Sequence, residues 1–161
     1  MRAAPLFALQ FLWFLIAWSI LAAFVVGPAI RKLDTYDQLA VWVAPHLFRV
    51  LGVGLLVPNL SPGLPIAFAA PTAIGDSITA MLALVSLIAL RRRWSGVRTL
   101  VWVFNLFGSA DLLFAVAHAV RVEAALYLQA QWYVPALGVP LMFVAHFMVF
   151  RTLMAPREGA A

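Results

Sequence analysis

Apolar side chains fill five long runs of this chain, and short polar or basic segments separate the runs. A helix needs about 20 consecutive apolar residues to cross the hydrocarbon core of a bilayer. The third run is shorter than this, and the other four reach or approach it. The pattern therefore predicts an all-α fold, a polytopic membrane helix bundle with five transmembrane helices, over residues 6–30, 39–57, 76–90, 99–120 and 131–154.

The composition indicates the same class of protein. Hydrophobic residues make up 65% of the 161 residues and charged residues 11%, whereas a soluble domain carries about 25% charged residues. We expect a single transmembrane domain over residues 1–161. The sequence contains no cysteine, which excludes disulfides and thiolate metal sites. The net charge of +5 comes from span ends rather than from an exposed soluble face, so no nucleic-acid partner is expected.

The basic residues predict how the helices are oriented, because cytoplasmic segments of membrane proteins are enriched in Lys and Arg. With the N-terminus outside, only Arg2 and Arg121 face the outside. The inside then holds the other basic residues that flank the spans, which are Arg31, Lys32, Arg91, Arg92, Arg93, Arg98, Arg151 and Arg157. We therefore expect a multi-pass protein of the cell membrane, in a bacterium the inner membrane, with its C-terminus in the cytoplasm. Four spans are the alternative. If residues 39–57 did not cross the membrane, Arg31 and Lys32 would lie on the same side as Arg91, Arg92 and Arg93, which the charge rule also allows.

Residues 58–75 are rich in proline and carry no charge. The prolines Pro58, Pro62, Pro65 and Pro71 predict that no continuous helix forms here. The segment is either an external loop or a re-entrant segment that dips back into the bundle, where protein must cover its backbone. The next span then begins at Asp76, which we expect to cap its N-terminus.

Polar residues inside the spans fall into two layers when depth is counted at about 1.5 Å per helical residue. Arg49, Asp76 and Asp111 form a central layer, and His46, Asn105 and His146 form a layer nearer the basic ends of the spans. An ion pair between Arg49 and one of the two carboxylates is expected. Such a pair can serve only to hold helices in register.

The second carboxylate of the central layer favours a functional interpretation. Two carboxylates beside one arginine leave a net negative site in a low dielectric, which can take up a cation or give a proton to a substrate. Asp111 and His146 are the candidate catalytic residues for such acid–base chemistry. The candidate binding residues are Arg49, Asp76, Asn105 and His46.

The histidines raise the question of a metal or haem. His46 and His146 share a predicted depth and could in principle be the two axial ligands of a haem. The spans contain no His-x-x-His pair and no glutamate. Single histidines in apolar helices are more often hydrogen-bonded core residues, so no metal site is expected and haem is only an option.

The order of short motifs is similar to that of small multi-pass bacterial membrane proteins of unassigned function. The resemblance covers most of the chain after the first span, and no activity is implied by it. It rests on Arg49, Gly63-Leu64-Pro65, Phe68-Ala69, Gly75-Asp76, Asn105, Gly108, Asp111, Pro140 and His146.

Three functions are compatible with these features. The first is an intramembrane pocket that binds a hydrophobic molecule, such as a membrane lipid or an isoprenoid. If the protein is an enzyme, it transforms this molecule by acid–base chemistry. The proline-rich segment would be the wall or lid of this pocket. The second is a non-catalytic subunit of a larger membrane complex, with protein partners or as a homo-oligomer. The third is a proton- or cation-coupled carrier, which the lack of an internal repeat disfavours.

Overall fold

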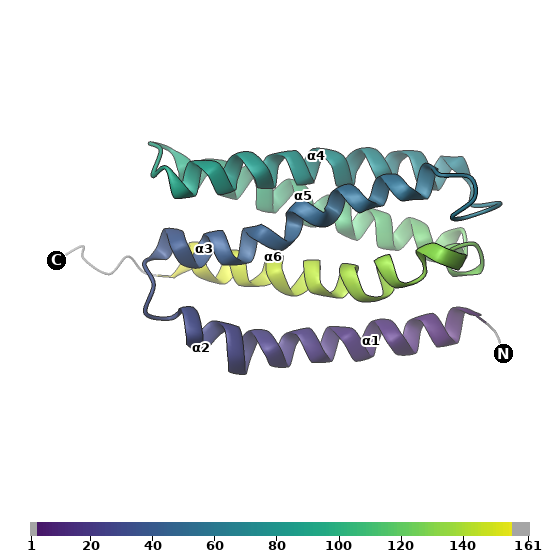
Figure 1. Cartoon of the computed structure of the whole chain (residues 1–161), viewed down its shortest axis with the longest axis horizontal. Coiled ribbons are helices and arrows are strands. Elements are labelled where there is room, and N and C mark those ends of the chain that lie inside the picture. Colours follow the sequence, from purple (N-terminus) through teal and green to yellow (C-terminus); the bar gives the residue numbers. More distant parts are fainter. Residues whose placement is uncertain (1–2, 156–161) are drawn as a thin grey trace.

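The computed structural model describes residues 3–155 of the chain. Five helical segments of this part are long and apolar enough to cross a membrane. They run along one common direction, with the links between them at the two ends (Figure 1). The prediction of five rather than four candidate spans is confirmed at the level of helix number and composition. Arg2 and Arg157, which enter the charge count, lie outside the described residues.

Three of the five segments are built from more than one kind of helix, in which π turns or 3₁₀ turns adjoin an α-helix. The first segment joins α1 (Ala3–Leu21), the π-helical η1 (Ala22–Val26) and α2 (Gly27–Ile30). The second joins α3 (Thr35–Val43) and the 3₁₀ helix η2 (Ala44–Leu56). The third and fourth are α4 (Ile66–Arg91) and α5 (Val97–Arg121). The short turns η3 (Ala124–Leu126) and η4 (Gln129–Gln131) lead to η5 (Val134–Gly138) and α6 (Val139–Met154).

The second segment begins at Thr35, four residues before the predicted start at Leu39. Asp34 explains the early start, because its Oδ1 accepts hydrogen bonds from the backbone N–H groups of Tyr36 (2.9 Å) and Asp37 (3.1 Å). From Ala44 onward the segment continues as a 3₁₀ helix, which rises about 2.0 Å per residue instead of 1.5 Å. The 3₁₀ form carries Arg49 deeper into the bundle than an α-helix would.

The prediction of a helix break over residues 58–75 was wrong in its second half. Only the stretch up to Pro65 is irregular, and α4 starts at Ile66 with Pro71 inside it. A proline near the start of a helix removes a single hydrogen bond, and the neighbouring turns keep theirs. Asp76 therefore lies in the interior of α4 and is not its N-cap. Residues 66–75 form the first turns of a 26-residue helix, not a re-entrant loop.

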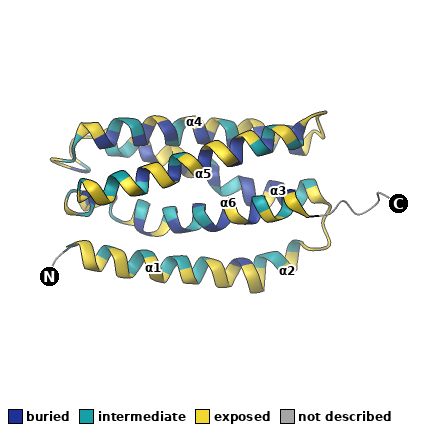
Figure 2. Ribbon diagram, turned by 180° about the vertical axis from the view of Figure 1, so that it is seen from behind, coloured by how far each residue is buried: buried dark blue, intermediate teal, exposed yellow. Residues whose placement is uncertain are grey.

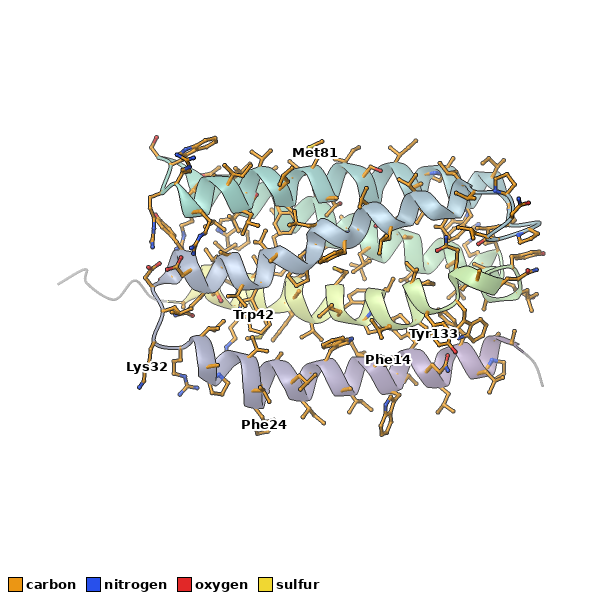
Figure 3. The ribbon with its side chains drawn as sticks, viewed as in Figure 1. Phe14, Phe24, Lys32, Trp42, Met81 and Tyr133 are labelled. Atoms are coloured by element: carbon orange, nitrogen blue, oxygen red, sulfur yellow. The ribbon has the colours of Figure 1, made fainter. Side chains whose placement is uncertain are left out.

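The first segment stands apart from the other four. It contacts α6, η5 and η3, and very few of its residues are fully buried (Figure 2). Phe24 points away from the bundle and is 75% exposed, and Met81 of α4 also points outward (Figure 3). Outward-facing apolar side chains are expected where lipid is the solvent. The buried apolar core lies between α3, α4, α5 and α6, towards the end of the bundle that carries Arg31, Arg91 and Arg151, which we call the basic end.

Candidate functional site

Arg49 of η2 is bonded to both candidate carboxylates, and not to one of them as predicted. Its Nε donates to Oδ1 of Asp76 on α4 over 2.7 Å, and its Nη2 donates to Oδ2 of Asp111 on α5 over 2.5 Å. The third guanidinium nitrogen, Nη1, donates to the backbone carbonyl of Gly108 over 2.9 Å. One buried arginine thus ties η2 to two neighbouring helices, and with both carboxyls ionised the three side chains carry a formal net charge of −1.

Glycines make room for these carboxylates. A Cβ on Gly52 of η2 would collide with the carboxylate of Asp76, and a Cβ on Gly75 of α4 would collide with the carboxylate of Asp111. Each carboxylate therefore lies against bare backbone of the neighbouring helix, where only hydrogen fits. The Arg49-x-x-Gly52 spacing is a signal of this packing, because residues three apart share a helix face and both of these residues contact Asp76.

The predicted second layer also comes together. Nδ1 of His146 is 2.7 Å from Oδ1 of Asn105, and the imidazole rings of His46 and His146 lie with their centroids 4.0 Å apart. Phe104 packs against both rings. All of these side chains are buried. Both ring nitrogens of His46 and Nε2 of His146 have no hydrogen-bond partner among the described residues.

Gly108 connects the two layers. Its carbonyl accepts from Arg49, and its Cα faces His146, since a Cβ there would lie 2.7 Å from Cε1 and 2.9 Å from Nε2 of that ring. The same Cβ would lie 2.7 Å from Cγ2 of Thr79 on α4. Helices α4, α5 and α6 therefore meet around this glycine, between the carboxylate layer and the histidine layer.

The contact between the two imidazoles does not suit a haem. A haem held by His46 and His146 would need its porphyrin plane between the two rings, which already pack against each other. Within residues 3–155, no three His, Asp or Glu side chains converge as ligands of a metal ion.

A cavity of about 460 Å³ lies in the half of the bundle opposite the basic end. Ligand-binding pockets typically measure about 300–1,000 Å³ and are mostly apolar, with a few polar groups that orient the ligand. The walls of this cavity come from α1, η2, α4, α5, η5 and α6, together with the connector over residues 123–128. Its larger apolar side chains are Phe7, Phe11, Phe48, Phe68, Leu112 and Met142.

Polar groups line this cavity at one end and at one point of the connector. Arg49, Asp76 and Thr72 are the polar lining residues of the inner end, and Glu123 lines it from the connector. Thr72 lies one turn before Asp76 on the same face of α4, and its hydroxyl has no partner among the described residues. Arg49 and Asp76 are therefore part of both the ion-pair cluster and the cavity surface.

The other predicted site residues do not line this cavity. Asp111 is bonded to Arg49 but does not itself line the cavity. Asn105, His46 and His146 lie in the layer nearer the basic end. Of the proline-rich segment 58–75, Phe68 and Thr72 line the cavity from α4, whereas the irregular stretch up to Pro65 does not. Further walls come from α1 and the connector. These walls could not be predicted from the sequence, because apolar residues that face a cavity look the same as those that face lipid.

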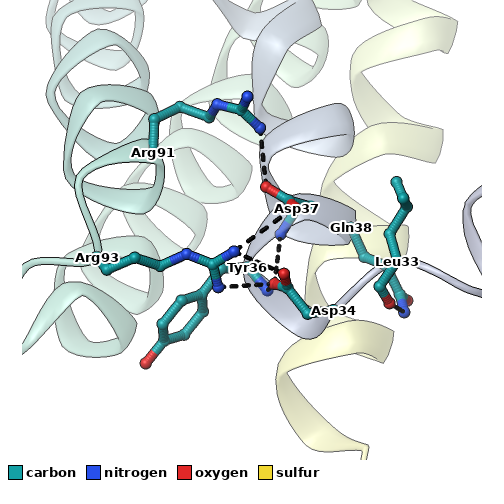
Figure 4. A network of polar contacts seen from close by, with 7 residues as sticks. All are labelled: Leu33, Asp34, Tyr36, Asp37, Gln38, Arg91 and Arg93. Carbon is teal, nitrogen blue, oxygen red and sulfur yellow. Dashed lines mark hydrogen bonds and ion pairs between the residues drawn. The ribbon is translucent and has the colours of Figure 1, made fainter.

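A second polar cluster lies at the basic end, where Asp34 and Arg93 lie just outside the candidate spans and Asp37 and Arg91 lie at their ends (Figure 4). Arg93 donates to both oxygens of Asp34, over 2.8 and 2.6 Å, and Arg91 donates to Oδ1 of Asp37 over 2.8 Å. The hydrogen bond from Arg93, assisted by the N–H groups of Asp37 and Tyr36, lowers the pKa of Asp34 below its usual range. These pairs join the start of α3 to the end of α4.

Comparison with protein families assigns most of the chain to one family. The model of DUF8737, a domain of unknown function, matches residues 6–154. The chain belongs to the DUF8737 family. The match covers both polar layers and nearly all of the five helical segments, so the site described above lies within the part of the chain that the family model matches. No curated protein and no solved structure matches the chain.

Proposed function

We propose that this DUF8737 protein is a multi-pass protein of the cell membrane that binds a hydrophobic, lipid- or isoprenoid-like molecule in the cavity beside Arg49 and Asp76. The observation that carries the proposal is the cavity itself, which is apolar along most of its surface and polar at its inner end. A molecule with a hydrocarbon body and one polar end matches this distribution. Its body would replace water or lipid against Phe7, Phe48 and Phe68.

The polar end of the cavity favours a hydroxyl group over an acid. Arg49 is already bonded to two carboxylates, which leave a net charge of −1, so an anionic head group would be repelled. Asp76 uses only Oδ1 in its bond to Arg49, and its side chain is 17% exposed. A hydroxyl can donate to the free oxygen of Asp76, and it can accept from Thr72 once the buried, unpartnered hydroxyl of that residue turns towards the cavity. A long-chain or isoprenoid alcohol is therefore the ligand class we propose.

Any acid–base step at the polar inner end would involve Asp76, since it is the carboxylate that lines the cavity there. Asp111 and His146, the catalytic candidates from the sequence, would act as positioning residues. Asp111 holds Arg49, and His146 packs on Gly108, whose carbonyl holds the same guanidinium.

The proposed orientation has the N-terminus outside and the basic end in the cytoplasm, in a bacterium across the inner membrane. Arg31, Arg91 and Arg151 gather at one end of the bundle, as the charge rule for cytoplasmic segments requires. The cavity would then lie in the outer half of the bilayer. With α1 as one wall, a ligand could enter sideways from that leaflet.

Ligand-induced thermal stabilisation in detergent tests the proposal. Farnesol and oleyl alcohol should raise the melting temperature of the purified protein, whereas oleate should raise it less. Gly138 lines the cavity, and a Cβ there meets nothing within 4 Å, so Gly138→Phe should fill the cavity and abolish the shift. Gly138→Ala is the matched control and should keep it. A shift that persists in Gly138→Phe would count against the cavity as the binding site.

A pair of threonine variants tests the polar end separately. Thr72 lines the cavity, and Thr72→Val removes its buried hydroxyl, which has no partner among the described residues. The change should therefore weaken alcohol binding without destabilising the free protein. Thr79→Val is the control on the same helix, because Thr79 does not line the cavity and its hydroxyl bonds to the carbonyl of Gly75. Equal affinity for oleyl alcohol in the wild type and Thr72→Val would overturn the proposed head-group contact.

A further inference from the structure

A wide groove opens at the basic end of the bundle, on the side where the first segment meets α5 and α6. Its volume is about 1510 Å³, and polar atoms form more of its lining than apolar atoms. The groove is distinct from the apolar cavity, because it lies at the opposite end of the helices. The proposed function makes no use of it.

Basic side chains from several separate segments converge on this groove. Arg31 and Lys32 come from the end of the first segment, Arg98 from α5 and Arg151 from α6. None of these four residues forms an ion pair with a described residue. Arg93 also lines the groove, but Asp34 neutralises it.

This convergence goes beyond what membrane topology requires. The charge rule asks only that basic residues lie at the inner end of the spans, on any side of the bundle. Arg91 and Arg92 satisfy the rule without lining the groove, whereas Arg31, Lys32, Arg98 and Arg151 all line it. Four like charges around one hollow repel each other and create a strong positive potential, which an anion would relieve.

The walls of the groove favour an anion that carries hydrocarbon. Ala22, Ala23 and Gly27 of the first segment are small and leave space on one side, while Trp102 and Met148 form apolar surface on the other. Trp42 lines the same groove, and tryptophan side chains are enriched at the level of lipid head groups. The groove thus has positively charged side chains at its outer part and apolar surface towards the bundle.

We infer that this groove binds the head group of an anionic phospholipid, with the phosphate among Arg31, Arg98 and Arg151 and the acyl chains against the small residues of the first segment. Arg98 is held in place for this role, since its Nη2 donates to the backbone carbonyl of Leu153. Basic pockets between helices at the inner surface are known to bind anionic head groups. A bound lipid would link the loosely packed first segment to α5 and α6.

Lipid titration of the full chain in detergent, followed by native mass spectrometry, tests this inference. The probes are phosphatidylglycerol and phosphatidylcholine with identical acyl chains. Phosphatidylglycerol should bind more tightly to the wild type. Arg151→Gln should weaken its binding about fivefold, the equivalent of roughly 1 kcal/mol per basic residue near the surface. Lys32→Gln is a second variant and should weaken phosphatidylglycerol binding by a similar factor, because Lys32 also lines the groove and is exposed.

Arg92→Gln is the matched control, since it removes one exposed charge at the same end but outside the groove. It should change the affinity less than about twofold, because screening limits the reach of an exposed charge. Equal binding of the two lipids, or an equal loss in Arg92→Gln and Arg151→Gln, would overturn the inference. Displacement of phosphatidylglycerol by millimolar inorganic phosphate would also overturn it, because the ligand would then be a free anion.

Discussion

Gly108 and His146 pack against each other at the α5–α6 interface, so closely that a Cβ on the glycine would lie 2.7 Å from Cε1 of the imidazole. The carbonyl of the same glycine accepts a hydrogen bond from Arg49. His146 is itself held by Asn105. Gly108 therefore fixes the distance between the ion-pair cluster and the histidine layer, and neither can shift without the other.

Gly108→Ala should lower the melting temperature of the protein in detergent. The methyl group would meet both His146 and Thr79 at 2.7 Å. Overpacking of this kind costs about 1–3 kcal/mol, against a gain of about 1 kcal/mol in helix propensity from Gly to Ala. Gly138→Ala is the control, because its methyl meets nothing within 4 Å and should be neutral or stabilising. Equal melting temperatures for the two variants would show that the Gly108 contact is not tight.

Arg49→Met should destabilise the bundle strongly. It leaves Asp76 and Asp111 buried without their shared partner, and the loss of one member of a buried ion pair costs about 3–5 kcal/mol. The triple variant Arg49→Met, Asp76→Asn, Asp111→Asn carries no charge in the cluster. It should therefore melt above Arg49→Met, although it contains more substitutions. Intrinsic tryptophan fluorescence on heating gives both melting temperatures.

Arg92→Met serves as the control for the loss of a positive charge, since Arg92 is exposed and should tolerate the change. The prediction fails if Arg49→Met melts with the wild type. It also fails if the triple variant melts below Arg49→Met, because the uncompensated carboxylates would then not be the cause of the loss.

Cysteine labelling can test the proposed orientation directly, because the chain has no native cysteine. Asn59 lies in the irregular stretch before α4, and Ser95 lies in the link between α4 and α5, at the opposite end of the bundle; both are exposed. A membrane-impermeant maleimide should label Asn59→Cys in intact spheroplasts and Ser95→Cys only after the membrane is opened. The reverse pattern would mean that the basic end faces outward.

The sequence was sufficient to predict which polar residues share a depth. An α-helix rises by a nearly constant amount per residue, so the distance of Asp76 or Asp111 from the basic end follows from counting. Counting does not say which helices are neighbours or which way a side chain points around the helix axis. The bond of Arg49 to both carboxylates depends on those two facts. The sequence alone therefore predicted a bond to one carboxylate or the other, and not to both.

The other differences also have local causes. Proline content alone predicted a break up to Asp76, but Pro71 lies close enough to the start of α4 for the helix to continue through it. The cap at Asp34 lengthened the second segment by a turn that its hydrophobic pattern did not contain. The role of α1 as a cavity wall does not show in its sequence pattern, because that helix is apolar on every side.

The ion pair between Asp34 and Arg93 should make stability depend on pH at the acid end. The pKa of Asp34 is lower in the folded protein than in the unfolded chain, since Arg93 donates to its carboxylate. Its contribution is therefore complete above the unfolded pKa of about 3.9 and is lost as the pH falls from there towards the folded pKa. Between pH 7 and pH 3 the wild type should lose more in melting temperature than Asp34→Asn.

Comparison with Asp34→Asn isolates this pair, because the other carboxylates titrate alike in both proteins. Asparagine retains an oxygen that can accept from the N–H groups of Tyr36 and Asp37, so the cap of α3 survives while the charge is lost. Asp34→Ala removes both and should be less stable than Asp34→Asn at pH 7, by about 1 kcal/mol for the lost cap. If the wild type and Asp34→Asn respond equally to acid, the pair with Arg93 does not stabilise the fold, and the link from α3 to the end of α4 depends on the contact of Asp37 with Arg91.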